Sequence, residues 1–314
     1  MSLHTIILAA GHGSRMKSKK AKVLQQIGGT SMLEKICYTA GAVSSDITLV
    51  VGFDKESVLE EAGNYNLNIT SSLQPKPIGT GDAVRCGLDK VKDHSKVLVL
   101  YGDVPLIRKE TLQNLIESSD SGLSILTTVL DKPFGYGRVK TNDNNEALKI
   151  VEEKDATDEE RQIQEIFTGV LCGSKALIEE GLSKITNNNA AGEFYLTDLV
   201  SIINEKGIRI NTYKASNDEV KGANSKQELE QLETTYRAMK AEDLFEKGIT
   251  ITDASRLDVR GSVECGRDCS IDVNVILEGN IILGDNVSIG PNSILKNTSI
   301  GNNTKIEAFS HIDG

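Results

Sequence analysis

A glycine-rich turn followed by two cationic side chains lies close to the start of the chain. Residues 8–16 read LAAGHGSRM after an apolar run, and Lys22 comes shortly afterwards. Glycines allow a backbone to approach phosphate closely and to direct N–H groups at it. Arg15 and Lys22 add positive charge at this spacing. The segment therefore predicts the binding of phosphate groups, with an ordinary structural turn as the alternative.

The turn differs from two common phosphate-binding motifs. Met16 stands where the pattern G-x-G-x-x-G needs its third glycine, and the Gly-Lys-Ser/Thr ending of a P-loop is absent. Three further polar candidates are Asp103, Glu152 and Asn224. Taken singly, each has a simpler explanation as a turn residue, a solvated charge or a helix cap. Only their place in the family resemblance given below favours a site.

The composition limits the class of function. The 314 residues carry a net charge of −10, with 39% apolar and 25% charged residues, which is ordinary for a globular protein. No apolar run is long enough to cross a bilayer, no basic stripe suits nucleic acid, and the N-terminus lacks the features of a secretory signal. We therefore expect neither a membrane nor a nucleic-acid partner. The cations crowded into residues 15–22 suit a small anion such as a nucleoside triphosphate, although a charge run alone is better explained as a solvated loop.

Five cysteines are scattered along the chain. An odd and dispersed set does not predict a disulfide framework and fits a reducing cytoplasm. Cys265 and Cys269 resemble half of a metal site, but no second pair of Cys or His follows. Small buried residues are therefore the better interpretation.

The elements that must position the polar candidates alternate up to about residue 224. Apolar, strand-like runs are separated by segments of helical spacing such as 31–42 and 82–91. This alternation predicts an α/β domain with a mostly parallel sheet, in which ligands lie beyond the carboxyl ends of the strands. The predicted strands are Thr5–Ala10, Ile47–Val51, Lys96–Leu100, Ser124–Val129, Ala147–Val151 and Phe167–Leu171.

The pattern changes in the last third of the chain. Residues 225–247 read as one long helix, which Gly248 ends. Aliphatic or cysteine residues then recur every six positions from Val259 to Leu295, and the period resumes at Ile300 after one residue drops out. A hexapeptide period predicts a parallel β-helix. The repeat stops at Gly314 without an evident cap, so we expect a fragment of a longer protein or an end covered by something else.

The glycine turn resembles the signature of the sugar-phosphate nucleotidyltransferase family, Leu-x-x-Gly-x-Gly-Thr/Ser-Arg-Met followed by Pro-Lys-x-Leu. The second part reads Ala21-Lys22-Val23-Leu24 here, so alanine replaces the usual proline while the lysine is kept. Over essentially the whole chain, the sequence resembles the bifunctional N-acetylglucosamine-1-phosphate uridylyltransferase/glucosamine-1-phosphate acetyltransferases. Further segments in the family order are residues 74–81, 98–106, 135–138, 151–156, 187–198 and 222–224.

The resemblance implies uridylyl transfer from UTP to N-acetylglucosamine 1-phosphate, giving UDP-N-acetylglucosamine and pyrophosphate for cell-envelope polysaccharide precursors. A sugar phosphate oxygen is already anionic at neutral pH, so no general base is needed. Two anions must meet at the α-phosphorus while pyrophosphate leaves in line, so catalysis rests on positioning and on charge stabilisation. Mg²⁺ prefers oxygen ligands and takes few from protein. The resemblance implies that Asp103 and Asn224 hold this cofactor.

The other roles are also implied by the resemblance. Arg15 and Lys22 stabilise the phosphates and form the catalytic set together with Asp103. Gln74 reads the edge of uracil, because an amide carries both a donor and an acceptor. Gly137 and Glu152 meet the sugar. The residues implied to surround the nucleotide are Leu8, Ala9, Ala10, Gly11, Gln74, Gly79, Thr80, Tyr101 and Gly102.

The resemblance further implies the arrangement of the chain. We expect a Rossmann-like uridylyltransferase domain at residues 1–224, a linker helix at 225–248, and the first coils of a left-handed β-helix at 249–314. The handedness comes from the resemblance and not from the repeat. The family's acetyl site lies in later coils between subunits, so we expect no acetyltransferase activity from this chain. The resemblance also implies a cytoplasmic homotrimer packed along the β-helices.

Two rival functions and one departure stay open. A related sugar-1-phosphate nucleotidyltransferase would use another sugar or base. A non-catalytic regulatory homologue would be expected to lose the basic and metal-binding groups, which are all present here. The departure is Phe167, which stands where the family carries an asparagine at the sugar pocket. Its ring either stacks on the sugar or turns into the core, with a neighbour remodelling the pocket.

Overall fold

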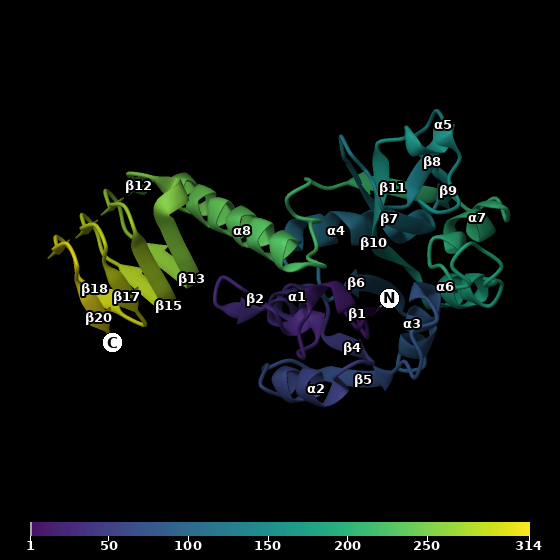
Figure 1. Ribbon diagram of the computed structural model, residues 1–314, viewed down its shortest axis with the longest axis horizontal. Coiled ribbons are helices and arrows are strands. Elements are labelled where there is room, and N and C mark those ends of the chain that lie inside the picture. The colour runs from purple at the N-terminus through teal and green to yellow at the C-terminus, as the bar shows by residue number, and fades with distance from the viewer. Residues whose placement is uncertain (1) are drawn as a thin grey trace. The chain divides into compact units, whose positions relative to one another are not determined.

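The chain folds as two compact units in a computed structural model that describes residues 2–314 (Figure 1). The larger unit comprises the chain up to Gln25 together with Met32–Ser225, and the smaller comprises Gln26–Ser31 together with Lys226–Gly314. A short segment near the N-terminus thus groups with the C-terminal part of the chain. Within the described residues, no helix has the length and apolar character needed to cross a bilayer.

A nine-stranded sheet forms the centre of the larger unit. The strand order is β11-β7-β10-β6-β1-β4-β5, and β8 and β9 join it through β10. Strand β1 pairs in parallel with β4 and β6, whereas β10 runs antiparallel to β6 and β7. The predicted α/β class with a mostly parallel sheet is therefore confirmed. The strands are β1 (Leu3–Ala9), β4 (Asp46–Val51), β5 (Ile69–Leu73), β6 (Lys96–Tyr101), β7 (Leu123–Val129), β8 (Arg138–Thr141), β9 (Ala147–Val151), β10 (Glu165–Ser174) and β11 (Ile210–Lys214).

Two hydrophobic cores cover the opposite faces of this sheet. Ile6 and Leu8 of β1 belong to one core together with α3 and α6, while Ile7 and Ala9 belong to the other together with α1 and α4. A strand buried on both faces reads as a continuous apolar run, which is the pattern of β1. The helices are α1 (Met32–Gly41), α2 (Lys55–Gly63), α3 (Thr80–Leu88), α4 (Lys109–Ser118), α5 (Asp158–Arg161), α6 (Lys175–Leu182) and α7 (Asp198–Asn204), with 3-10 turns η1 (Ser14–Met16), η2 (Lys22–Leu24) and η3 (Ser119–Ser121).

The smaller unit contains a hairpin of β2 (Gln26–Ile27) and β3 (Thr30–Ser31), packed on the long helix α8 (Lys226–Glu246). The backbone N–H of Gly28 donates to Glu233 Oε2 at 2.8 Å. Gly28 has a φ of +54°, and a Cβ at this position would lie 2.0 Å from the Tyr236 ring. Only glycine fits this turn, because it tolerates the left-handed conformation and needs no room for a side chain.

Parallel strands form successive coils in the rest of the smaller unit. Val259 pairs with Leu277, and Leu277 pairs with Leu295, so the first coils are 18 residues long and hold three hexapeptides each. Leu283 then pairs with Ile300, a step of 17 residues that matches the residue missing from the repeat. The stacked aliphatic side chains form a core of their own. The predicted start of a parallel β-helix is confirmed in β12 (Thr250–Ile251), η4 (Ala254–Arg256), β13 (Leu257–Cys265), β14 (Ser270–Ile271), β15 (Val275–Leu283), β16 (Ser288–Ile289), β17 (Ile294–Lys296), β18 (Ser299–Ile300), β19 (Lys305–Ile306) and β20 (His311–Asp313).

Candidate active site

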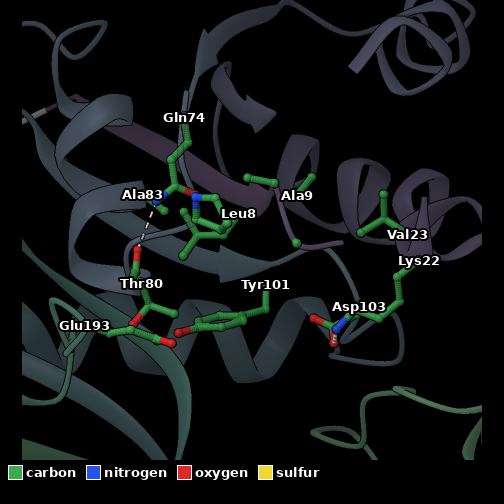
Figure 2. A pocket seen from close by; sticks show the side chains of 14 residues that line it. Leu8, Ala9, Lys22, Val23, Gln74, Thr80, Ala83, Tyr101, Asp103 and Glu193 are labelled. Atoms are coloured by element: carbon green, nitrogen blue, oxygen red, sulfur yellow. Dashed lines mark hydrogen bonds and ion pairs between the residues drawn. The ribbon is translucent and has the colours of Figure 1, made fainter. Parts of the chain in front are cut away.

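Two adjoining cavities lie beyond the carboxyl ends of β1 and β6 in the larger unit. The first has a volume of about 300 Å³ and the second about 400 Å³. They meet along five residues that line both: Lys22, Thr80, Tyr101, Asp103 and Glu193. Figure 2 shows the side chains of Lys22 and Asp103 pointing toward one another within the first cavity. The carboxyl edge of the sheet is where an α/β fold places its ligands.

The first cavity is walled by the glycine turn and by the segment after β5. Almost all residues expected around the nucleotide line it, and Gly102 is the exception. Its backbone N–H donates to the carbonyl oxygen of Leu8 at 2.9 Å, and a Cβ at Gly102 would lie 2.9 Å from Val23. Gly102 therefore packs behind the wall. The expected residues that line the cavity are Leu8, Ala9, Ala10, Gly11, Lys22, Gln74, Gly79, Thr80, Tyr101 and Asp103.

Gln74 is a buried amide whose orientation is fixed by its partners. Its Nε2 donates to the Gly79 carbonyl oxygen and to Asp82 Oδ2, at 3.0 Å in each case. Both partners are acceptors, so the amide nitrogen must face them. Gln74 therefore offers its amide oxygen, an acceptor, to a ligand in the first cavity.

The Gln74 segment is held against residues 194–196 by backbone contacts. Gly81 N–H donates to the Phe194 carbonyl oxygen at 2.8 Å, and Leu196 N–H donates to Thr80 Oγ1 at 3.1 Å. Gly79 has a φ of +132°, and a Cβ there would lie 2.4 Å from the carbonyl oxygen of Phe194. This close approach requires glycine and joins two segments that are far apart in the sequence.

A cation and two side-chain oxygens meet at the junction of the two cavities. Lys22 Nζ lies 2.5 Å from Asp103 Oδ2 and 3.0 Å from Asn224 Oδ1. The carboxylate and the amide oxygen thus converge on one positive charge. Among residues 2–314, no group of three or more Asp, Glu, His or Cys could form a cage for a metal. Two converging oxygen ligands fit Mg²⁺, which usually keeps waters and substrate oxygens for its other positions.

The second cavity contains the remaining predicted residues. Exposed Arg15 on η1 lines it together with Gly137, Glu152 and Asn224. Glu152 accepts a hydrogen bond from Thr197 Oγ1 at 2.9 Å. Burial raises the pKa of this carboxyl above its ordinary value, and the nearby acidic side chains act in the same direction. A half-buried carboxylate beside an open cavity can accept hydrogen bonds from hydroxyl groups of a ligand.

Phe167 belongs both to a core and to the wall of the second cavity. It is 6% exposed and packs within the core on the α3 and α6 side of the sheet. Its backbone N–H donates to the carbonyl oxygen of Gly137 at 2.9 Å, which ties the two wall residues together. The cavity wall at this position is therefore apolar.

The lining residues that the sequence analysis missed include Glu193, Tyr195 and Thr197. Glu193 lines both cavities, and Thr197 holds Glu152. All three lie in segment 187–198, which the sequence analysis recognised as a motif without assigning roles within it. Burial raises the pKa of the Tyr101 hydroxyl, the residue at the boundary between the cavities.

Comparison with known proteins gives a family match and several curated relatives. Residues 5–177 match the family described as MobA-like NTP transferase domain. A "Bifunctional protein GlmU" from Methylococcus capsulatus is 46% identical over 283 residues, covering 89% of this chain and 61% of that protein. The protein of the same name from Francisella philomiragia is 44% identical over 281 residues, covering 89% and 62%. The predicted resemblance to bifunctional enzymes is confirmed, and the chain spans about 61% of the length of these relatives.

A solved structure supports the fold. The putative glucose-1-phosphate thymidylyltransferase from Bacillus anthracis superposes with a TM-score of 0.58 and 18% sequence identity, over 74% of this chain and 94% of that one. At this identity the likeness concerns the fold alone. The family match contains the glycine turn, Lys22 and Asp103, and it covers more than half of the 314 residues. The chain therefore belongs to the MobA-like NTP transferase domain family.

Proposed function

We propose that the larger unit transfers a uridylyl group from UTP to N-acetylglucosamine 1-phosphate with the help of Mg²⁺, and releases UDP-N-acetylglucosamine and pyrophosphate. The observation that carries the proposal is the cluster of Lys22, Asp103 and Asn224 at the junction of two cavities. One cavity has the glycine turn and a fixed amide, and the other has a half-buried carboxylate. This arrangement suits a nucleotide on one side, a sugar phosphate on the other, and the reacting phosphorus between them.

Charge stabilisation is the main task of the protein in this reaction. The attacking sugar phosphate and the α-phosphate of UTP are both anions, so their approach needs fixed positive charge. Lys22 lies at the junction, and exposed Arg15 lines the second cavity from the glycine turn. Both cations would hold phosphate oxygens in line, which lowers the entropic cost of bringing the reactants together.

Asp103 and Asn224 would hold Mg²⁺ through Oδ2 and Oδ1, the two atoms that now face the Lys22 ammonium group. When bound, the metal ion would supply positive charge to the phosphate oxygens. The half-buried position of this cluster strengthens each charge interaction relative to bulk water.

The base preference is proposed from Gln74. Both hydrogens of its amide nitrogen are used by Gly79 and Asp82, so the side chain presents an acceptor. Uracil carries a donor at N3–H, whereas the corresponding N3 of cytosine is an acceptor that this amide oxygen would repel. The sugar preference rests on Glu152, whose carboxylate suits hydroxyl groups, together with Gly137, which lines the same cavity.

Pyrophosphate release from each nucleoside triphosphate, with and without N-acetylglucosamine 1-phosphate, tests the proposal. We expect release only with UTP, the sugar phosphate and Mg²⁺ together. Asp103→Asn and excess EDTA should each cut turnover heavily, while the circular dichroism of Asp103→Asn stays like that of the parent. Equal turnover with another base or sugar 1-phosphate would support the related-enzyme rival. No turnover with any pair would support the non-catalytic rival.

We also propose a homotrimer assembled along the β-helix, in line with the family resemblance. Large apolar side chains are exposed on its coils, with Phe309 79% exposed and Ile282 40% exposed. Apolar groups in such positions are suited to contact between neighbouring copies. Light scattering at increasing concentration is expected to show a mass approaching three chains. A monomer mass at the highest concentration would contradict the proposal.

A further inference from the structure

The position of Lys22 depends on the residue before it. Ala21 is fully buried, with φ −50° and ψ 144°, and it leads directly into the turn η2 that carries Lys22. In the related signature this position is proline, whose ring fixes φ near −65°. Ala21 adopts a conformation that proline could adopt, but it has no ring to enforce it.

A hydrogen bond from Ala21 makes use of a group that proline lacks. The backbone N–H of Ala21 donates to Asp54 Oδ2 at 3.0 Å, across 33 positions of sequence. Proline has no N–H, so this bond is available only because alanine stands here. The other carboxylate oxygen of Asp54 accepts a hydrogen bond from Ser57 Oγ at 2.7 Å. The Asp54 carboxylate thus accepts one hydrogen bond from a residue of α2 and another from Ala21.

Asp54 occupies a backbone conformation that matches this task. It precedes α2 with φ +53° and ψ 39°, which is the left-handed region, and its side chain does not cap a backbone N–H of its own helix. An aspartate before a helix usually does cap it. Here the carboxylate is directed at a different segment, and the uncommon conformation is maintained by its surroundings.

The loop that contains Asp54 contacts both ends of the segment that runs from Ala10 to Ala21. Phe53 N–H donates to the Ala10 carbonyl oxygen at 3.3 Å, and the Phe53 ring lies 4.0 Å from the His12 ring, centroid to centroid. Asp54 holds the far end at Ala21. Residues 52–54 therefore bracket the segment from the glycine turn to Lys22.

We propose that Asp54 is a positioning residue for Lys22, and that its hydrogen bond with the Ala21 N–H replaces the proline ring of the related signature. By fixing Ala21, the carboxylate keeps Lys22 Nζ at Asp103 and Asn224. The inference rests on the proposed function in one respect, namely that Lys22 acts on the reacting phosphates. Asp54 itself lines neither of the two cavities, so in this role it does not contact the substrate.

A double-mutant cycle at positions 54 and 21 tests the proposal. We expect Asp54→Ala to lower kcat tenfold or more with little change in the KM for UTP, because Lys22 loses its placement while the nucleotide wall stays intact. Adding Ala21→Pro to this variant should restore kcat to within threefold of the parent. The proline ring then fixes φ at position 21, and the Asp54 carboxylate that it would otherwise contact has been removed. Asp54→Asn keeps an acceptor oxygen and should retain most of the activity.

Ser57→Ala is the matched control for loop stability. It removes a bond to the same carboxylate but leaves the bond to Ala21, so its kcat should stay near that of the parent. If Asp54→Ala keeps full kcat, or if Ala21→Pro fails to rescue a variant that melts at the parent temperature, the positioning role is wrong.

An activity-independent measurement separates this inference from the proposed function. Amide hydrogen exchange over residues 17–25 should speed up in Asp54→Ala and slow again in the double variant. If the parent transfers no uridylyl group but the exchange pattern holds, the proposed function fails and the Asp54 contact stands. If the parent is active and exchange is unchanged in Asp54→Ala, the inference fails alone.

Discussion

Phe167 illustrates how one side chain is constrained by two environments. Its ring packs within a core on one face of the sheet, and it also forms wall of the second cavity. The two alternatives considered from the sequence, a ring in the pocket or a ring in the core, are therefore not exclusive. For a substitution at this position, both stability and kinetics must be measured, because a polar side chain is expected to destabilise the core and to strengthen binding of the sugar.

Phe167→Asn is expected to lower the melting temperature and the KM for N-acetylglucosamine 1-phosphate together. Removing a buried aromatic ring costs about 3–5 kcal/mol for replacement by alanine, and an amide in its place adds a polar group to the core. An added hydrogen bond to the sugar is worth roughly 0.5–1.5 kcal/mol. Thermal unfolding gives the melting temperature, and steady-state kinetics with each substrate varied in turn gives the two KM values. Phe167→Leu is the control and should leave both KM values unchanged; a shift in the UTP KM equal to that of the acceptor would contradict the assignment.

Glu152 is a second residue at which function and stability are opposed. Burial raises its pKa above the ordinary 4.5, and Asp198 and Asp155 add to this rise. The folded protein therefore holds the proton more tightly than the unfolded chain does. Stability is greatest below the unfolded pKa, falls as pH rises through the folded pKa, and stays reduced above it.

Glu152→Gln should remove this pH-dependent loss. We expect its melting temperature to exceed that of the parent at pH 7, and the difference to shrink as pH falls toward 4.5. The KM for the sugar phosphate should rise, because a neutral amide accepts weaker hydrogen bonds than a carboxylate. Melting curves between pH 4 and pH 8 check the first expectation. A difference in melting temperature that is constant across this range would show that ionisation is not its cause.

At the scale of elements, the buried strands were predictable, whereas the edge strands β5 and β11 were not. The continuous apolar runs of β1, β4 and β6 identified them from the sequence, with ends within two residues of those observed. Strand β5 reads ITSSL and lies at the edge of the sheet, where polar side chains reach solvent and leave no apolar pattern. Likewise, the meeting of Lys22 and Asn224 spans 202 positions, and only the order of family motifs suggested it.

The backbone contact between the Gln74 segment and residues 194–196 can be tested by substitution at Gly79. Gly79→Ala would place a Cβ against the carbonyl oxygen of Phe194 in a backbone conformation that alanine rarely adopts. For a strain of roughly 1–3 kcal/mol, we expect the KM for UTP to rise about tenfold or more. Gly63→Ala is the control, because a Cβ there meets nothing within 4 Å. Steady-state kinetics should show a raised KM for UTP in Gly79→Ala and an unchanged KM in Gly63→Ala. A normal KM for UTP in Gly79→Ala would contradict a role for this contact.

At the scale of the whole molecule, the chain is not divided into units in simple sequence order. Residues Gln26–Ser31 group with the C-terminal part, and nothing in their sequence pattern indicated it. The reason is physical, since the hairpin is held by Gly28 against Glu233 and Tyr236, and such tertiary contacts leave no local signal.

Tyr236→Ala should loosen this hairpin. The side chain is 7% exposed, so its removal leaves a cavity beside Gly28 and lowers the melting temperature of the smaller unit. Proteinase K is expected to cut within residues 26–31 faster than in the parent. Lys240→Ala removes a cation 5.6 Å from the Tyr236 ring centroid and serves as the control. Equal cleavage rates in parent and Tyr236→Ala would show that the hairpin does not depend on the ring.

The hydrogen bond between Gly28 and Glu233 also imposes a delay between the synthesis of the hairpin and the formation of its native contacts. The two residues are separated by 205 positions. At a synthesis rate of roughly 5–20 residues per second, the helix that receives the hairpin is made about 10–40 s after the hairpin itself. Ile27, fully buried in the finished protein, spends that interval without its final surroundings. The earliest-made turn of the smaller unit thus cannot reach its native contacts until about 205 further residues have been synthesised.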